Sequence, residues 1–214
     1  MRQSASVRDA QLLLDGIDPV LDAVIAEHGP APLRSARPAS RRFPSLAESI
    51  AYQQLNGSAA ATIWGRVVSA VDGDVSPEAI LGAGHDRLRA CGLSTAKTVS
   101  MLDLAQRSAD GEIAFARIGR LSDDEVIGSL TRVRGIGRWT AQMFLIFTLG
   151  RVDVWPTGDY GVRSGLATAW GLDRHPTERE MEVLGEPFAG ARSLVSWYCW
   201  RVADTAKGTS MGRS

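Results

Sequence analysis

Apolar residues recur at intervals of three and four along most of this chain, which is the spacing of amphipathic helices. An apolar stripe at residues 20–25 follows Asp18 and Pro19, a pair that can serve as N-cap and first helical residue. Gly29 follows as the expected end of that helix. Strands would need alternating β-branched residues between hairpin turns, and we find no such run. The pattern therefore predicts an all-α protein.

The same signals predict the remaining helices. They are expected at residues 43–55, 58–71, from Ser76 and Pro77 onward, from Ser94 onward, from Ser122 to Arg134, from Arg138 onward, from Thr177 toward Phe188, and at 192–204. Ser122 with Glu125, and Thr177 with Glu180, have the spacing of capping boxes. No period of 20 to 50 residues repeats, which argues against a solenoid. Residues 205–214 are small and polar, and we expect them to be disordered.

The most informative break in the pattern is Gly135-Ile136-Gly137, between the helix that stops at Arg134 and the helix that starts at Arg138. Glycine reaches positive φ freely and has no side chain, so a phosphate can approach the backbone N–H groups of such a turn. Those groups open a helix, where the dipole favours an anion. Ile136 can fix the turn to the core. The alternative is a plain helix–turn–helix corner with a glycine cap.

The distribution of charge favours a phosphate-binding turn over a plain helix–turn–helix corner. The net charge is zero, which by itself argues against a nucleic-acid binder. However, 22 of the 24 basic residues are arginine, the residue suited to bidentate contacts with phosphate. Codon bias explains most of them. Arg132, Arg134, Arg138 and Arg151 lie between Thr131 and Val152 without an acidic residue, and this cluster indicates an anionic partner.

The bulk composition excludes several classes of protein. A chain of 214 residues with 44% hydrophobic and 22% charged residues is typical of globular proteins. It has no apolar run of about 20 residues and no signal peptide, so we expect a cytoplasmic protein without membrane association. Cys91 and Cys199 cannot form a multi-cysteine metal site, and we expect reduced thiols. His28, His85 and His175 lack companions at metal-ligand spacing.

Leu130-x-x-Val133-x-Gly135-Ile136-Gly137-x-x-Thr140-Ala141, followed by Pro156-x-x-Asp159, resembles the helix-hairpin-helix DNA glycosylase superfamily. Within it the chain is similar to the AlkA type, the 3-methyladenine DNA glycosylases II. Three further stretches support this likeness: Phe43 to Leu55 with Gln53-Gln54-Leu55 at its end, Gly92-Leu93-Ser94-x-x-Lys97, and Arg192 to Trp200. The resemblance extends from about Asp18 to Asp204. Well-known members carry a β-rich N-terminal domain, for which the residues before Phe43 are too few, so a compact form is expected.

The resemblance implies two helical lobes, with DNA and the damaged base bound in the cleft between them. We expect a central lobe at residues 57–155, ending in a helix-hairpin-helix at about 122–149. Residues 1–56 and 156–204 would form the second lobe.

The resemblance also assigns the catalytic carboxylate to Asp159. Breaking an N-glycosidic bond builds positive charge on the sugar, which a fixed carboxylate stabilises. The alternative is that Asp159 only caps the helix that begins near Tyr160. Relatives with lyase activity carry a lysine where this chain has Trp139, so a monofunctional enzyme that leaves an abasic site is expected. Iron–sulfur members carry four cysteines after the catalytic region, and this chain has only Cys199 there.

Four residues are implied to line the base pocket: Trp139, Trp200, Met143 and Tyr160. An indole face attracts a cation by about 0.5–2 kcal/mol. Stacked tryptophans therefore select alkylated purines, which are cationic or electron-poor. The alternative is that the tryptophans are core residues. Some relatives have an aromatic residue in place of Met143 and an acid in place of Gly158, which leaves the base preference open.

The remaining implied contacts concern DNA. The expected DNA-binding residues are Gly135, Ile136, Gly137, Arg138, Arg134, Thr140 and Lys97. Gln53, Gln54 and Leu55 are expected to supply the wedge that fills the gap left by the extruded base. A monovalent cation, Na+ or K+, is expected on the carbonyls of Thr131, Val133 and Ile136, and only in complexes with DNA. No other cofactor is expected.

The sequence thus predicts a monomeric base-excision repair glycosylase that removes alkylated purines such as 3-methyladenine and 7-methylguanine from double-stranded DNA, in the cytoplasm at the nucleoid. Two alternatives stay open. One is a glycosylase for deaminated or oxidised bases. The other is a non-catalytic helix-hairpin-helix module that only binds DNA.

Overall fold

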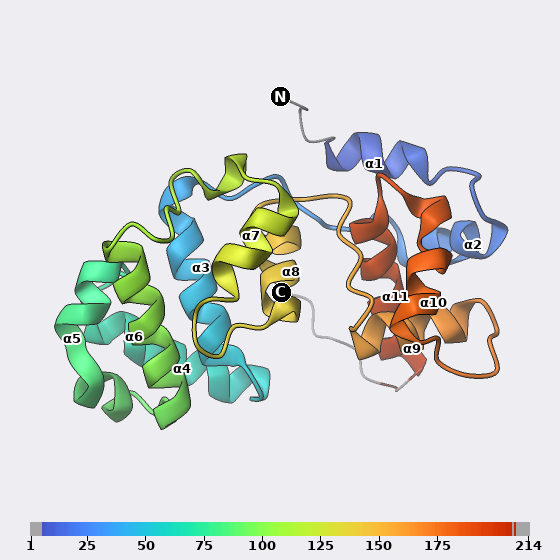
Figure 1. Ribbon diagram of the computed structural model, residues 1–214. Coiled ribbons are helices and arrows are strands. Elements are labelled where there is room, and N and C mark those ends of the chain that lie inside the picture. The colour runs from blue at the N-terminus through green and yellow to red at the C-terminus, as the bar shows by residue number, and fades with distance from the viewer. Residues whose placement is uncertain (1–5, 207, 209–214) are drawn as a thin grey trace. The chain divides into compact units, whose positions relative to one another are not determined.

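The computed structural model describes residues 6–206 and 208, and within them every regular element is a helix. The elements are α1 (Val7–Leu13), α2 (Pro19–His28), α3 (Ala39–Tyr52), α4 (Gly57–Ala70), α5 (Pro77–Ala90), α6 (Thr95–Ala109), η1 (Ile118–Arg120), α7 (Asp123–Leu130), α8 (Arg138–Phe147), α9 (Tyr160–Ala169), α10 (Glu178–Leu184), η2 (Glu186–Phe188) and α11 (Arg192–Ala206) (Figure 1). The all-α prediction is confirmed.

The chain divides into two compact units, and their boundaries differ from those predicted. Residues 36–149 form one unit, while the described residues of 1–35 and 150–214 form the other. The prediction that residues 1–56 belong together is wrong for α3. The apolar face of α3, formed by Phe43, Leu46, Ala47, Ile50 and Ala51, is buried, and the helix contacts α4, α6 and α8. These partners place α3 in the unit that contains the hairpin.

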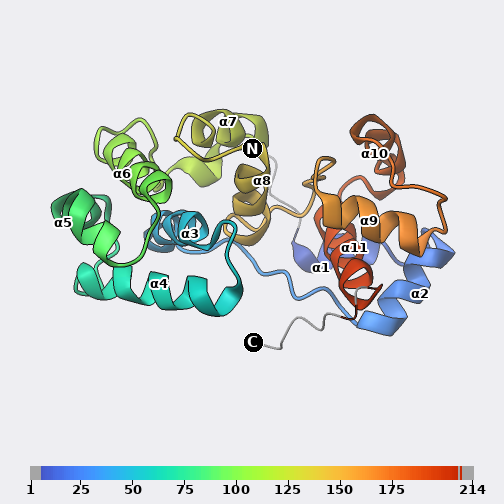
Figure 2. The ribbon, with the colours of Figure 1, turned by 90° about the horizontal axis from the view of Figure 1, so that it is seen from below.

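In the unit of residues 36–149, α3 is the central helix, with α4, α6 and α8 packed around it (Figure 2). Helices α5 and α6 pack against each other, and α7 packs against α8 across the Gly-Ile-Gly turn. An aromatic chain ties α3 to α8: Phe43 meets Phe115 edge to face at 5.7 Å, and Phe115 meets Phe144 at 6.0 Å. The helices on either side of the turn are thus fixed to one core.

In the other unit, α11 packs along α9 and also contacts α2. The crossing of α9 and α11 is close because Gly165 has no side chain: a Cβ there would lie 1.8 Å from the Cys199 carbonyl oxygen. Tyr198, 1% exposed, accepts a hydrogen bond from the Ala31 N–H and donates one to the Gly29 carbonyl, each at 3.1 Å. These contacts fix α11 to both its neighbours.

The predicted helix caps are confirmed. Asp18 accepts hydrogen bonds from the N–H groups of Val20 and Leu21, and Ser94 caps α6. Both capping boxes are formed, by Ser122 with Glu125 and by Thr177 with Glu180. Helix α1 was not predicted, because its seven residues give too short a pattern.

The C-terminal segment, residues 205–214, was predicted to be disordered, and this prediction is wrong for its first two residues. Thr205 and Ala206 complete α11, whereas residues 207 and 209–214 lie outside the described residues. Among the helices that the structure describes, none is long and apolar enough to cross a membrane.

Candidate functional site

The Gly-Ile-Gly turn forms the predicted hairpin between α7 and α8. Leu130, Val133 and Ile136 are buried, with Ile136 4% exposed, while Gly135 and Gly137 face solvent. The Ile136 N–H donates to the Val133 carbonyl at 3.1 Å and closes the turn. Ile136 therefore fixes the turn to the core, as predicted, and leaves the glycine backbone exposed.

The two glycines serve different purposes. Gly135 has φ +75°, and a Cβ there would lie 2.5 Å from Ser100 Oγ. Both the backbone conformation and the packing on α6 therefore require glycine at this position. Gly137 has φ −92° and open space around it. Its lack of a side chain has no packing role, so it leaves room for something outside the protein.

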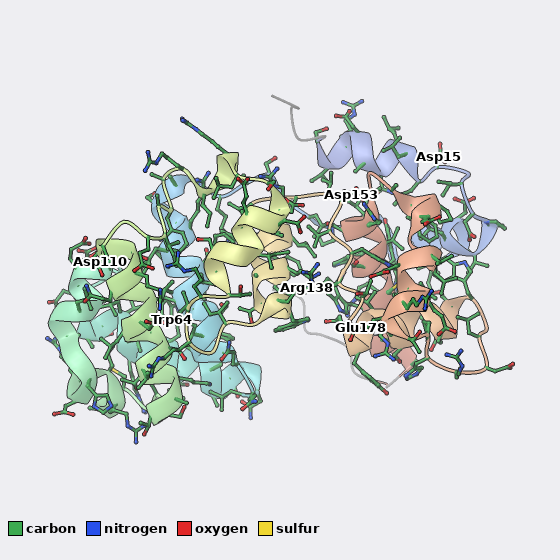
Figure 3. The ribbon with its side chains drawn as sticks, viewed as in Figure 1. Asp15, Trp64, Asp110, Arg138, Asp153 and Glu178 are labelled. Atoms are coloured by element: carbon green, nitrogen blue, oxygen red, sulfur yellow. The ribbon has the colours of Figure 1, made fainter. Side chains whose placement is uncertain are left out.

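The start of α8 has the properties of an anion-binding site. Gly137 is its N-cap, so no side chain caps the first turn, where the helix dipole favours negative charge. Arg134 and Arg138 are exposed on either side of the turn, and neither forms an ion pair with a residue that the structure describes. Arg138 is labelled in Figure 3. Arg132 instead pairs with Glu112 at 2.8 Å. The positive charge at the turn therefore comes mainly from Arg134 and Arg138.

Three residues that were expected to contact DNA form contacts within the protein instead. Thr140 is 6% exposed and packs inside the unit. The Lys97 ammonium donates to the Ala51 carbonyl in the last turn of α3 at 2.8 Å, and burial lowers the pKa of Lys97. Gln53, predicted as part of the wedge, donates through Nε2 to the Gly135 carbonyl at 3.1 Å. Gln54 and Leu55 are exposed between α3 and α4, as a wedge requires.

A pocket of about 270 Å³ opens within this unit between α3 and α8. Met143, one of the predicted base-pocket residues, lines it together with Thr140 and Phe147 of α8. From α3, Glu48 and Tyr52 line it, spaced by four residues and so on one helix face. Sequence reasoning missed Glu48 and Tyr52, although their spacing was visible. Trp139, 52% exposed, lies one turn before Met143 on the same helix.

Asp159 lies in the other unit at the start of α9. It is 8% exposed and is the N-cap of α9: its Oδ1 accepts from the Val162 N–H at 2.8 Å. The same oxygen accepts a hydrogen bond from Trp200 Nε1 at 2.9 Å. The capping role considered from the sequence is thus confirmed. The indole contact adds a second fixed donor, from a residue 41 positions along the chain.

Gly161 makes the contact between Trp200 and Asp159 possible. A Cβ at Gly161 would lie 2.8 Å from Trp200 Cδ1 and 3.2 Å from Asp159 Oδ1. A Cβ atom essentially never comes within 3.0 Å of a heavy atom of a residue that is not its neighbour in the chain. Gly161 was missed from the sequence, because nothing local marks a glycine in a first helical turn as a tertiary contact.

The first turn of α11 holds the segment that leads to Asp159. Arg192 forms a two-pronged ion pair with Asp153, which is labelled in Figure 3, at 2.6 and 2.7 Å. Ser193 Oγ accepts from the Val154 N–H at 2.9 Å and donates to the Arg151 carbonyl at 2.8 Å. Burial raises the pKa of Asp153, but the Arg192 hydrogen bond and further N–H donors outweigh it and hold this pKa below its ordinary value. The helix that carries Trp200 therefore also positions the chain before Asp159.

The remaining aromatic residues of this unit have structural contacts. Trp155 Nε1 donates to the Met181 carbonyl at 2.6 Å, and Trp197 packs edge to face on Tyr198. Tyr160, predicted for the base pocket, is 59% exposed, and its ring lies 5.1 Å from that of His175.

Cys199, beside Trp200 in the chain, is 1% exposed. Burial and the nearby charge of Asp159 raise the pKa of its thiol. Cys199 is therefore an uncharged packing residue at neutral pH. Among the described residues, no group of three or more His, Cys, Asp or Glu side chains is arranged to hold a metal ion.

The predicted site residues thus fall into two groups. The hairpin, the exposed arginines, Trp139, Met143 and the wedge residues belong to the unit of residues 36–149, whereas Asp159, Tyr160 and Trp200 belong to the other.

Comparison with known proteins identifies the family of the chain. The model of the HhH-GPD superfamily of base excision DNA repair proteins matches residues 47–189, a range that includes the hairpin and Asp159. The DNA-3-methyladenine glycosylase 1 of Schizosaccharomyces pombe is 31% identical over 207 residues, covering 95% of this chain and 91% of the relative.

Two solved structures are also similar. The 3-methyladenine DNA glycosylase of S. pombe in complex with abasic DNA has a TM-score of 0.79 at 32% identity, covering 92% of this chain and 96% of that one. A DNA-3-methyladenine glycosidase from Bacillus halodurans has a TM-score of 0.81 at 29% identity, covering 93% and 91%.

Proposed function

Because the chain belongs to the HhH-GPD superfamily of base excision DNA repair proteins, we propose that it is a monofunctional DNA glycosylase that removes alkylated purines. One observation carries the proposal: Asp159 is buried at a helix N-terminus, and its Oδ1 is held by the Val162 N–H and the Trp200 indole. A module that only binds DNA needs neither this carboxylate nor an aromatic residue fixed against it.

The proposed reaction is hydrolysis of the N-glycosidic bond. The bond between C1′ and the base nitrogen breaks, the base leaves with the bonding electrons, and positive charge develops on the sugar. The carboxylate of Asp159 stabilises that charge without moving, because its two donors already fix it. Water adds to C1′ and loses a proton, so the products are a free base and an abasic site.

Alkylated purines are the favoured substrates for two reasons. The indole rings of Trp139 and Trp200 would attract a cationic base, worth about 0.5–2 kcal/mol for each cation–π contact. Glu48 lines the same pocket as Met143, and its acidic side chain favours a positively charged ligand electrostatically. The relatives named for 3-methyladenine support the same class of substrate.

The absence of a lyase step is proposed from Trp139. Lyase members of the family form a Schiff base through a lysine at this position, and an indole cannot do so. The chain has lysine only at positions 97 and 207, and the Lys97 ammonium is bonded to the Ala51 carbonyl. The product should therefore be an intact strand with an abasic site.

The DNA would be bound at the exposed hairpin through phosphates. The Gly135 and Gly137 backbone, the start of α8, Arg134 and Arg138 provide contacts that do not read sequence. The carbonyls of Thr131, Val133 and Ile136 are oxygen ligands suited to Na+ or K+, which would add positive charge beside the phosphate when bound. We also propose that the enzyme acts as a cytoplasmic monomer on double-stranded DNA.

The direct test is to incubate the protein with methylated duplex DNA and to identify the released bases by chromatography. Release of 3-methyladenine or 7-methylguanine, with strand breakage only after alkali, supports the proposal. Release of deaminated or oxidised bases alone would indicate a glycosylase for those bases. Binding without release of any base would indicate a non-catalytic module that only binds DNA. Strand breakage without alkali, or trapping by borohydride, would contradict the monofunctional mechanism.

A further inference from the structure

The turn between α3 and α4 is held in place by two side-chain donors from distant parts of the chain. Gln53, the C-cap of α3, donates from Nε2 to the Gly135 carbonyl at 3.1 Å, across 82 residues of sequence. Lys97 donates from Nζ to the Ala51 carbonyl at 2.8 Å, across 46 residues. One bond therefore ties the turn to the hairpin, and the other ties it to α6.

The Lys97 bond is suited to holding a helix end. The last four carbonyls of a helix lack intrahelical partners, and a cation there also complements the dipole. Ala51 lies in the last turn of α3. Lys97 is half-buried, so its ammonium is partly withdrawn from water, and this burial lowers the pKa of Lys97. A lysine used for phosphate contact would extend into solvent instead.

One face of α6 contacts both the α3–α4 turn and the hairpin. Lys97, Ser100 and Asp103 are spaced by three residues and share this face. Lys97 holds the end of α3, and Ser100 lies against Gly135. Asp103 Oδ2 accepts from the Arg134 N–H at 2.8 Å. Helix α6 thus contacts the end of α3 at one point and the hairpin backbone at two others.

The tip of the α3–α4 turn is exposed and conformationally constrained. Gln54 has φ +56°, an uncommon conformation for a residue other than glycine. Leu55 follows it and is 42% exposed. Such a conformation is strained and persists only where its surroundings hold it. The bonds of Gln53 and Lys97, directly before the tip, are suited to do so.

We propose that Gln53 and Lys97 are positioning residues, which fix the exposed pair Gln54 and Leu55 at a set distance from the phosphate-binding hairpin. This inference rests on the proposed function and deepens it: Gln54 and Leu55 enter the duplex, whereas Gln53 stays bonded to the hairpin. Phosphate binding then places the wedge against the damaged base pair. Loosening either bond impairs base extrusion and leaves hairpin binding intact.

The test uses full-length Gln53→Met and Lys97→Met, which remove the donors with little change in side-chain length. Gln106→Met is the matched control, since Gln106 is exposed on α6 and, among the described residues, its side chain forms a hydrogen bond only with Asp110. Lys97→Arg retains a donor and should retain function. Each variant is checked by thermal melting. Its affinity for undamaged duplex and its single-turnover rate of base release are then measured.

The decisive comparison is between one alkylated base in a normal pair and the same base in a bulge, where little energy is needed to unstack it. A lost hydrogen bond of about 1–1.5 kcal/mol predicts release from the paired site slowed about tenfold. Release from the bulge should remain within about twofold of wild type, as should affinity for undamaged DNA. Gln106→Met should match wild type throughout.

Equal slowing at paired and bulged sites would overturn the inference, because the defect would then lie in chemistry. Unchanged release from the paired site in Gln53→Met would also overturn it, and so would loss of affinity for undamaged DNA. A wild-type protein that releases no base from either duplex would refute the proposed function itself. The wild-type measurement therefore distinguishes failure of the positioning inference from failure of the proposed function.

Discussion

Gly161→Ala tests how far the reaction depends on the contact between Trp200 and Asp159. The added Cβ would lie 2.8 Å from Trp200 Cδ1 and 3.3 Å from Nε1. Carbon atoms in contact prefer about 3.5–4.0 Å, so the indole must move by about 0.7 Å or more. Such a shift breaks or lengthens the 2.9 Å hydrogen bond to Asp159 Oδ1.

The expected magnitude follows from that bond. A hydrogen bond to a charged group contributes about 1.5–3 kcal/mol, which corresponds to a roughly 10- to 150-fold change in rate. Stability should change less. Alanine gains about 1 kcal/mol of helix propensity over glycine, which offsets part of the roughly 1–3 kcal/mol cost of overpacking. We therefore expect a melting temperature within a few degrees of wild type and a much slower release of alkylated bases.

Gly158→Ala is the matched control, in the same segment and with the same added methyl group. Its Cβ would meet the Glu178 carboxylate at 3.5 Å, an ordinary contact. Single-turnover release from a methylated duplex should be near wild type for Gly158→Ala and reduced for Gly161→Ala. Equal rates for the two variants would refute the argument that Gly161 makes room for the indole.

Four further variants test the hairpin and the segment before Asp159. Gly137→Ala should fold normally and weaken binding to all duplexes alike in a fluorescence titration, whereas Gly135→Ala should lower the melting temperature as well, because its Cβ would collide with α6. Arg138→Gln should reduce the slope of log affinity against log salt by about 0.9, as expected for one lost phosphate contact, and an unchanged slope would count against that contact. Asp153→Asn should cost about 1 kcal/mol at neutral pH, since it removes a half-exposed two-pronged pair with Arg192. The pKa of Asp153 is lowered on folding, so the pair stabilises the protein above the unfolded pKa of about 4 and loses its effect as pH falls through the folded value; melting curves for wild type and variant should therefore converge in acid.

The features that sequence predicted well are those set by neighbouring residues. The caps at Ser122 and Thr177 depend on a glutamate three residues later, so four consecutive residues contain both the sequence motif and the contacts that it forms. The hairpin was predictable for the same reason, since Gly135, Ile136 and Gly137 alternate between exposed backbone and buried side chain within three residues.

The features that were wrong or missed depend on contacts between distant residues. The pattern of α3 showed which face is buried but not which helices cover it, and this led to the wrong boundary after residue 56. Lys97 was expected to contact DNA, whereas its ammonium donates to the Ala51 carbonyl. Gly161 is required because a side chain there would collide with Trp200, which lies 39 positions later, and the residues next to Gly161 do not indicate this contact.

Asp159→Asn tests the central claim most directly. Asparagine is as good an N-cap as aspartate, so α9 and the fold should be retained. The variant lacks the negative charge proposed to stabilise the sugar cation. Base release from methylated duplex DNA should therefore be abolished while affinity for that DNA is unchanged. Release at the wild-type rate, or parallel loss of release and affinity, would contradict the assignment of Asp159 as the catalytic carboxylate.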